Sequence, residues 1–109
     1  MMDFDRLYIL ADDGRTPVAV TVHEWAVWFE TANRQTAFTL VSQEPLIEVS
    51  TIFLGLDYNV FRKGPPLLWE TMIFGGPNNQ WSGRWSSHDE ALEGHAAACL
   101  LAPTDATSR

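Results

Sequence analysis

The first part of the chain begins with an extended hydrophobic pattern. Residues 6–11 and 16–20 are short, mostly hydrophobic segments, separated by Asp12-Asp13-Gly14-Arg15. The Asp13-Gly14 pair suits the positive φ angles of a two-residue type I′ turn. We therefore expect an N-terminal β-hairpin.

A helix is expected directly after the hairpin. Thr21 and Glu24 form a capping box, in which the hydroxyl and the carboxylate each satisfy a backbone amide at the helix start. The hydrophobic residues behind this box recur at helical spacing, and they are Trp25, Trp28, Phe29 and Ala32. The predicted helix runs from Val22 to Asn33 or Arg34.

The middle of the chain is typical of β-structure. The segment 47–58 alternates at first and then becomes hydrophobic on both faces through Ile52-Phe53-Leu54. That change predicts a central strand that is covered on both faces near its end. The predicted strands are 37–41, 47–58, 67–74 and a short edge strand at 80–86, with breaks at 43–45, 59–66 and 75–79.

A second helix is expected from Ser87 to Leu101, because Ser87 and Glu90 form another capping box. Gly94 lies in the middle of this helix, where it costs about 1 kcal/mol relative to Ala. Close approach of a strand or an aromatic ring would compensate for that cost. A ligand or a partner's backbone at Gly94 is the alternative.

Together these elements predict an α+β fold in the order β-β-α-β-β-β-(β)-α. The simplest arrangement is an antiparallel sheet of about four to six strands with two helices packed on one face. Residues 1–102 are expected to form a single domain. Residues 103–109 are small and polar, and we expect them to be a flexible tail.

The composition supports a hydrophobic core and excludes some functions. Of the 109 residues, 46% are hydrophobic, and the net charge is -7. Direct nucleic-acid binding is disfavoured, because it needs Lys and Arg to displace counterions from phosphates, and so is an anionic membrane surface. An acidic protein can still offer carboxylates to the basic groove of a protein that handles nucleic acid.

Three observations bear on the compartment. Cys99 is the only cysteine, so no intramolecular disulfide can form, which fits a reducing environment. The first residues lack the basic and hydrophobic pattern of a signal peptide. The hydrophobic runs are far shorter than the about 20 residues of a membrane-spanning helix. We expect a soluble cytoplasmic protein, and the sequence leaves its oligomeric state open.

His95 and Cys99 lie one helical turn apart in the second helix. This spacing suits a thiolate–imidazole pair or two metal ligands. A zinc site needs at least three protein ligands, and no CxxC or HExxH motif supplies the others. The interpretation we favour is a core cysteine beside a hydrogen-bonded histidine, with no metal and no cofactor.

Asp57 and Glu70 fall on neighbouring strands of one predicted hairpin. Paired carboxylates can divide general-acid and general-base work, and with Gly94 and His95 they would line a pocket between the C-terminal helix and the sheet. Whether they share a face depends on the hairpin register. The alternative, which we favour, is that Asp57 caps the loop and Glu70 is solvated or paired with Arg62 or Lys63.

The segment from Gln80 to Trp85 is the candidate partner-binding site. Trp and Arg are enriched at binding hot spots, and Trp81, Arg84 and Trp85 lie close together here. On an alternating strand the two indoles point one way and Arg84 the other. Equally, both indoles could cover the core that faces the helix.

Two stretches carry a resemblance to a known family. They are Val49-Ser50-Thr51-Ile52-Phe53-Leu54-Gly55-Leu56-Asp57 and Gly64-Pro65-Pro66-Leu67-Leu68-Trp69-Glu70-Thr71-Met72-Ile73-Phe74-Gly75-Gly76, followed by Glu93-Gly94-His95. With these motifs the chain resembles, over about residues 6–101, a family of short proteins encoded by bacteriophages and prophages. The resemblance implies a phage origin and carries no mechanism with it.

The leading functional hypothesis is a non-enzymatic protein-binding module. Its expected partner is a host protein in a nucleic-acid-handling defence complex, which would make it an anti-CRISPR-like inhibitor of host defence. The second hypothesis is a protein that binds or sequesters a small ligand or nucleotide in the pocket near Gly94. The third is a small enzyme that uses His95 with nearby acidic residues.

Overall fold

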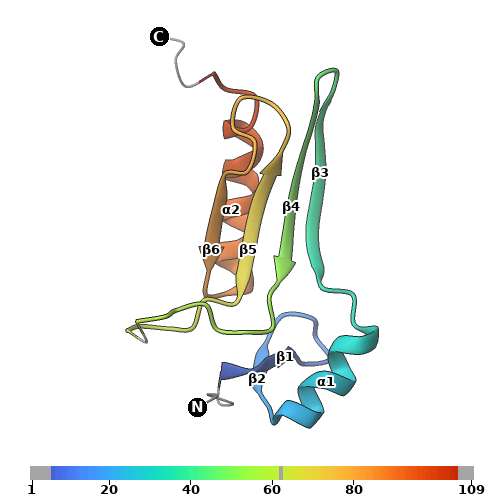
Figure 1. Ribbon diagram of the computed structural model, residues 1–109, viewed down its shortest axis with the longest axis vertical. Helices are drawn as coiled ribbons and strands as arrows, with labels where there is room; N and C mark the ends of the chain where they lie inside the picture. The colour runs from blue at the N-terminus through green and yellow to red at the C-terminus, as the bar shows by residue number, and fades with distance from the viewer. Residues whose placement is uncertain (1–5, 62, 106–109) are drawn as a thin grey trace.

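The computed structural model describes residues 6–61 and 63–105, and within them it has two helices and six strands (Figure 1). In chain order the elements are β1 (Tyr8–Leu10), β2 (Pro17–Ala19), α1 (Val22–Thr31), β3 (Gln35–Gln43), β4 (Leu46–Phe53), β5 (Trp69–Phe74), β6 (Ser82–Trp85) and α2 (His88–Leu101). The predicted α+β class and element order are confirmed. Residues 106–109, most of the predicted tail, lie outside the described part.

Four of the strands form one antiparallel sheet in the order β3-β4-β5-β6, so each strand pairs with the next in the chain. The central register places Thr39 opposite Val49, and Val49 opposite Ile73. α2 packs across one face of this sheet and contacts all four strands; in Figure 1 it lies behind β5 and β6.

Side chains on β4 and β5 alternate between a buried face and a more exposed one. Ile52 belongs to the more exposed face and is only partly buried. The prediction that the end of β4 is covered on both faces is therefore wrong, because α2 covers only one of them. The buried residues of the two strands are Ile47, Val49, Thr51, Phe53, Trp69, Thr71 and Ile73.

The N-terminal elements form a separate small unit at one end of the sheet. β1 and β2 pair as a two-stranded sheet, and α1 packs against β1 (Figure 1). Trp28 of α1 meets Phe53 edge to face at 5.8 Å, and the Trp25 indole donates to the Gly55 carbonyl at 2.8 Å. The two helices therefore do not share one face of one sheet. Gly55, with φ of 76°, turns the chain where β4 ends and gives the α1 aromatics room to approach.

The loop between β1 and β2 is longer than two residues. The Ala11 amide donates to the Thr16 carbonyl at 2.8 Å, and the Asp13 carboxylate accepts from the amides of Arg15 and Thr16. Hydrogen bonds from the Thr16 hydroxyl, which has the largest effect, and from these two amides lower the pKa of Asp13 to about 2. A type I′ turn needs positive φ at both central residues, and Asp13 lacks it. The predicted two-residue turn is wrong.

Both helices begin at the predicted caps. The first capping box is complete: the Glu24 amide donates to Thr21 Oγ1 at 3.2 Å, and Glu24 Oε1 accepts from the Thr21 amide at 3.0 Å. In the second, Ser87 Oγ accepts from the Glu90 amide at 3.1 Å, but the Glu90 carboxylate accepts from the Ser86 amide instead of the Ser87 amide. That contact ties the helix start to the end of β6.

Gly94 is explained by an aromatic ring. A Cβ atom at this position would overlap the six-membered ring of Trp85, closer than carbon atoms approach. The expectation that a neighbouring ring compensates for the helical glycine is confirmed. The missing side chain lets α2 lie directly on the indole of β6.

Replacing Gly94 with Ala should destabilise the protein by about 1–3 kcal/mol, the usual range for overpacking. In an exposed helix the same change stabilises by about 1 kcal/mol, so the sign of the effect is diagnostic. Urea unfolding measures it. In a Trp85→Leu background the ring is absent, and Gly94→Ala should become neutral or stabilising. The same loss in both backgrounds would contradict the proposed contact.

Candidate functional site

His95 belongs to a hydrogen-bond network between α2 and all four strands of the sheet. Its Nε2 lies 2.9 Å from Thr39 Oγ1, and its Nδ1 lies 2.8 Å from Thr51 Oγ1. Thr51 Oγ1 lies 2.6 Å from Thr71 Oγ1, which also accepts from the Trp85 indole at 3.0 Å. His95, Thr51 and Thr71 are all buried.

One arrangement of hydrogens lets both buried hydroxyls, Thr51 and Thr71, donate within the network. The Trp85 indole donates to Thr71, Thr71 donates to Thr51, and Thr51 donates to Nδ1 of His95. In that arrangement Nε2 carries the hydrogen and donates to Thr39. A protonated imidazole would donate from both nitrogens and leave one threonine hydroxyl without an acceptor in the network. Burial also lowers the pKa of His95, so the neutral ring is favoured.

Cys99 and His95 do not form a reactive pair. The Cys99 side chain is partly buried and packs against the hydrophobic cluster that contains Ile47, Val49 and Ala98. Both His95 nitrogens face threonine hydroxyls instead. Within residues 6–61 and 63–105, no three His, Cys, Asp or Glu side chains are grouped closely enough to hold a metal ion.

Asp57 organises the loop that follows β4. Its Oδ1 accepts from the Asn59 amide at 2.7 Å and from the Leu67 amide at 2.9 Å. The Asn59 side chain closes the same loop by donating to the carbonyls of Lys63 and Pro65. Asp57 therefore caps the loop, as the favoured alternative had it.

Glu70 lies on the sheet face opposite to α2. It pairs with Arg84 at 3.1 Å and not with the predicted Lys63; the other predicted partner, position 62, lies outside the described residues. His95 is on the α2 face, so the structure does not bring Glu70, Asp57 and His95 together.

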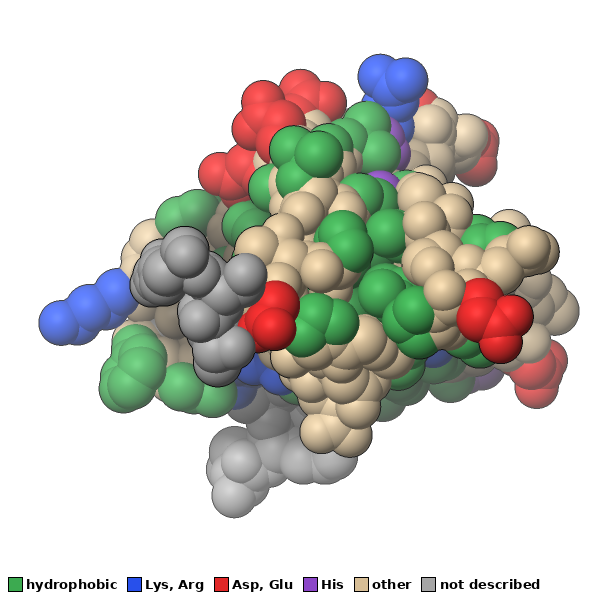
Figure 2. Space-filling view, turned by 90° about the horizontal axis from the view of Figure 1, so that it is seen from above, with side chains coloured by type: hydrophobic (Ala, Val, Ile, Leu, Met, Phe, Trp, Pro, Cys, Tyr) green, Lys and Arg blue, Asp and Glu red, His purple; other side chains and the backbone are tan. Residues whose placement is uncertain are grey.

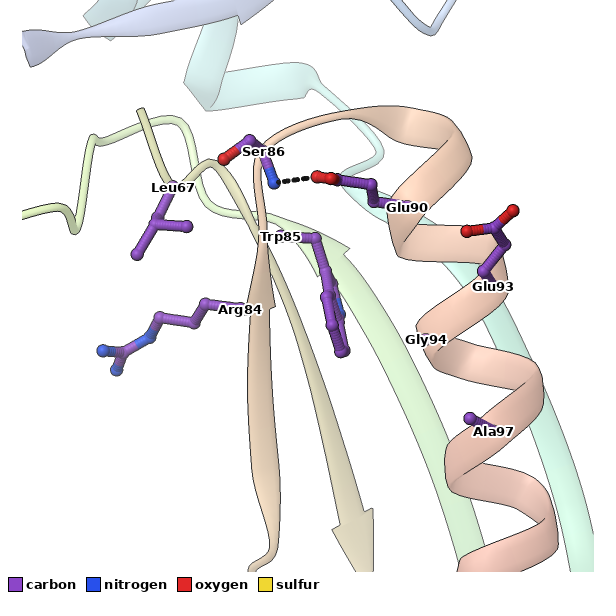
Figure 3. A pocket seen from close by; sticks show the side chains of 8 residues that line it. All are labelled: Leu67, Arg84, Trp85, Ser86, Glu90, Glu93, Gly94 and Ala97. Atoms are coloured by element: carbon purple, nitrogen blue, oxygen red, sulfur yellow. Dashed lines mark hydrogen bonds between the residues drawn. The ribbon is translucent and has the colours of Figure 1, made fainter. Parts of the chain in front are cut away.

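A groove of about 520 Å³ does lie between β6 and α2 (Figure 3). Of the four predicted pocket residues, only Gly94 lines it. Trp85 points across the groove toward the helix, while Arg84 points to the other side of β6. The lining residues are Leu67, Arg84, Trp85, Ser86, Glu90, Glu93, Gly94 and Ala97.

The predicted partner-binding residues lie on two sides of β6. Trp81 and Trp85 are partly buried and pack against the clusters beneath α2, on either side of Gly83. Arg84 is exposed on the opposite face, where its guanidinium also stacks over Tyr58 at 4.6 Å. The three residues do not form one continuous surface, and their role in partner binding stays a prediction.

A larger candidate surface is the sheet face away from α2, which we call the open face. Its large hydrophobic residues are Phe38 and Leu40 of β3, Leu46 and Ile52 of β4, and Met72 and Phe74 of β5. Phe38, Leu40, Leu46 and Phe74 have exposed fractions of 45–56%. No helix of the described chain covers this face (Figure 1).

The strand register places these side chains in rows across the open face. Phe38 is opposite Ser50, and Ser50 is opposite Met72; in the next row Leu40 is opposite Glu48, and Glu48 is opposite Phe74. A shallow hollow of about 100 Å³ lies among Ser50, Ile52, Glu70, Met72 and Phe74. In both rows a polar residue of β4 therefore lies between hydrophobic residues of β3 and β5.

Carboxylates interrupt the hydrophobic surface. Glu48 lies between Leu40 and Phe74, and Glu70 lies opposite Ile52 and pairs with Arg84, the one ion pair of these two carboxylates among the described residues. Figure 2 views the molecule from the end where β3 turns into β4, and hydrophobic side chains reach the surface there between acidic ones. The local charge has the sign of the whole chain.

Sequence reasoning missed this surface, although one signal was available. Phe38 and Leu40 alternate with Ala37, Thr39 and Val41, so that strand offers hydrophobic residues to both faces of the sheet. With two helices in the chain, one face had no obvious cover. A second exposed hydrophobic pair, Val60 and Phe61, lies in the loop after β4, with exposed fractions of 69% and 82%.

No helix among the described residues is long and hydrophobic enough to cross a membrane. Comparisons of the chain with protein-family models, with curated proteins and with solved structures each found no match. The function proposed below therefore depends on the geometry of the molecule and on the motifs of the sequence.

The stability of the protein should fall as the pH drops below about 6.5, the ordinary pKa of histidine. Native His95 resists protonation and the unfolded chain does not, so protons favour unfolding until the pH falls below the lowered native pKa. Urea unfolding between about pH 7.5 and 5.5 measures this dependence. His95→Gln should flatten it, and His23→Gln, at an exposed position, should not. An unchanged pH dependence in His95→Gln would contradict the argument.

Proposed function

We propose that this protein is a non-enzymatic protein-binding module that holds its partner on the open face. One observation carries the proposal: six large hydrophobic side chains lie on one sheet face that no described helix covers. Contiguous hydrophobic patches on soluble proteins commonly mark interaction sites. Fully burying one such side chain is worth about 1.5–3 kcal/mol, enough for a few of them to dominate an interface.

The charge suggests the kind of partner. The chain carries a net charge of -7, and Glu48 lies between Leu40 and Phe74 on the open face. A complementary surface would carry Lys or Arg among its hydrophobic groups. Proteins that handle nucleic acid expose such basic surfaces.

The phage resemblance narrows this class further. We propose that the partner is a host protein of a nucleic-acid-handling defence complex, met in the host cytoplasm and blocked by stoichiometric binding. The carboxylates of the open face would occupy basic groups that otherwise contact phosphates. Inhibition by occupation needs no catalytic group, in keeping with an open face that carries hydrophobic side chains and carboxylates.

The test is a double substitution, Leu40→Thr with Phe74→Thr. The two residues flank Glu48 across three strands, and Thr keeps their β-propensity. Tagged protein expressed in a bacterial host with defence systems should capture a stoichiometric partner, identified by mass spectrometry. The variant should bind that partner at least about 100-fold more weakly, as expected for two hot-spot residues.

Two control variants separate the open face from other exposed hydrophobic groups. Leu100→Thr and Phe61→Thr change residues with exposed fractions of 80% and 82%, on α2 and in the loop after β4. Both controls should bind like the wild type, and all variants should keep their melting temperatures. Full binding by the double variant, or loss of binding in either control, would place the site elsewhere.

The groove between β6 and α2 supports a second candidate function, the binding of a small ligand. Its wall includes the Trp85 indole, and Glu90 and Glu93 line the α2 side. An aromatic wall beside carboxylates suits a flat, cationic or amine-bearing molecule. This candidate does not use the open face, so the two proposals are tested independently.

A thermal-shift panel of nucleotides, amines and divalent metals tests the groove. A ligand at about 100 times its dissociation constant adds about 2.7 kcal/mol, which shifts the melting temperature of a domain this size by about 4–8 °C. Ala97→Leu would partly fill the groove and should abolish the shift. The absence of any shift across the panel would count against the candidate, and so would a shift that Ala97→Leu leaves unchanged.

A further inference from the structure

The sheet has two edge strands, β3 and β6, and β6 is protected against pairing with another strand. It has only four residues and carries the charged Arg84. The amide of Ser86, which follows it, is already bonded to the Glu90 carboxylate at 3.0 Å. Short length, charge and covered amides are devices by which natural edge strands avoid association.

β3 lacks the charge that protects β6, although bulges, another such device, flank its residues 37–40. It is nine residues long, Gln35–Gln43, and contains no charged residue and no proline. The whole chain, by contrast, has 14 acidic and 7 basic residues among 109. An uncharged, hydrophobic edge in such a chain is a surface suited to pairing.

The hydrogen-bond pattern shows which groups of β3 face outward. The Leu54 amide donates to the Leu68 carbonyl, so even-numbered residues of β4 bond to β5. Val49 and Thr51 therefore bond to β3, through their register partners Thr39 and Ala37. The amides and carbonyls of Phe38 and Leu40 point away from the sheet.

Two bulges limit the regular part of this edge. The register shifts between Gln35 and Ala37 and again between Leu40 and Ser42. A pairing strand can therefore meet a regular ladder only over residues 37–40. A symmetric antiparallel pairing that uses Phe38 and Leu40, and no bulged residue, has its two-fold axis at Thr39.

We propose that two copies of the chain pair through β3 in this antiparallel register. Phe38 of each copy then lies opposite Leu40 of the other copy. In each of these two pairs, the outward amide of one residue donates to the outward carbonyl of the residue opposite it, and the reverse. Thr39 meets its own copy at the axis. The pairing keeps like faces together, because Phe38 and Leu40 lie on the open face in both copies. The result is one continuous sheet of eight strands.

A second copy fits this edge better than an unrelated strand. A two-fold interface must be self-complementary. In the register centred on Thr39 the outward backbone groups of one copy match those of the other, and Phe38 of each copy meets Leu40 of the other. The repulsion between two chains of net charge -7 is not concentrated here, since β3 is uncharged. The inference goes beyond the proposed function, because the joined open faces stay free to bind a partner.

The first test compares Leu40→Pro with Leu40→Ala by sedimentation equilibrium. The Leu40 amide points outward, so proline removes a contact between the copies and none to β4. The wild type should be a dimer at about 200 µM, a concentration that detects micromolar association. Leu40→Pro should be monomeric, and Leu40→Ala, which keeps the amide, should remain dimeric with at most about 10-fold weaker association.

Three results would overturn the proposal: a monomeric wild type, a folded Leu40→Pro variant that still dimerises, or a dimer that Leu40→Pro and Leu40→Ala weaken equally. The last result would indicate that the copies meet through the side chains of the open face. Circular dichroism establishes whether Leu40→Pro is folded.

A cross-link tests the register even if Leu40→Pro fails to fold. Facing residues of a non-hydrogen-bonded antiparallel pair have Cα atoms about 4.5 Å apart, within disulfide range. In a Cys99→Ser background, Thr39→Cys should therefore form a covalent dimer under mild oxidation. Ala37→Cys should not, because Ala37 faces Val41 of the other copy. Equal cross-linking of both variants, or of neither, would refute the axis at Thr39.

Discussion

A four-stranded sheet has two faces to cover, and this chain supplies one long helix for them. α2 covers one face completely enough that Val49, Phe53, Trp69 and Ile73 are wholly buried. α1 is held at the end of the sheet by Trp28 on Phe53 and by the Trp25 indole on the Gly55 carbonyl, so it covers no part of the other face. The exposed hydrophobic surface, on which the proposed function rests, follows because no described helix packs on the second face of the sheet.

The choice of face is set by polar groups as much as by hydrophobic ones. Thr39, Thr51 and Thr71 lie on the α2 face of three neighbouring strands; His95 of α2 bonds to Thr39 and Thr51, and Thr51 bonds to Thr71. Unpaired buried hydroxyls are costly, so the helix is fixed in position over these threonines. Trp85 completes the arrangement, since its indole both donates to Thr71 and lies on Gly94. The position of α2 on the sheet is thus set by a few directional hydrogen bonds within a hydrophobic layer.

Local chemistry made much of the fold predictable. Thr21 and Glu24 marked the start of α1, Ser87 marked α2, and the helical glycine at position 94 pointed to a close aromatic neighbour. The predictions that were wrong depended on contacts between residues far apart in the sequence. The Asp13 carboxylate bonds two amides and lengthens the first loop, and the position of α1 depends on Gly55, 30 residues from Trp25. For the candidate site, the register of Ile52 with Glu70 put Glu70 on the face away from His95. A single sequence does not fix that register, nor the exposure of Phe38 and Phe74.

The pairing of residues 6 and 7 with the segment after β4 has a consequence for folding. Arg6 bonds to the carbonyl of Asp57, 51 positions later, and Leu7 bridges to Leu56. These residues can therefore settle only after β4 has formed. The sheet is bare on both sides until α2 packs on it. A product truncated ahead of His88 would expose hydrophobic residues on both faces of the sheet, so it would be prone to aggregate and would not form a smaller stable protein.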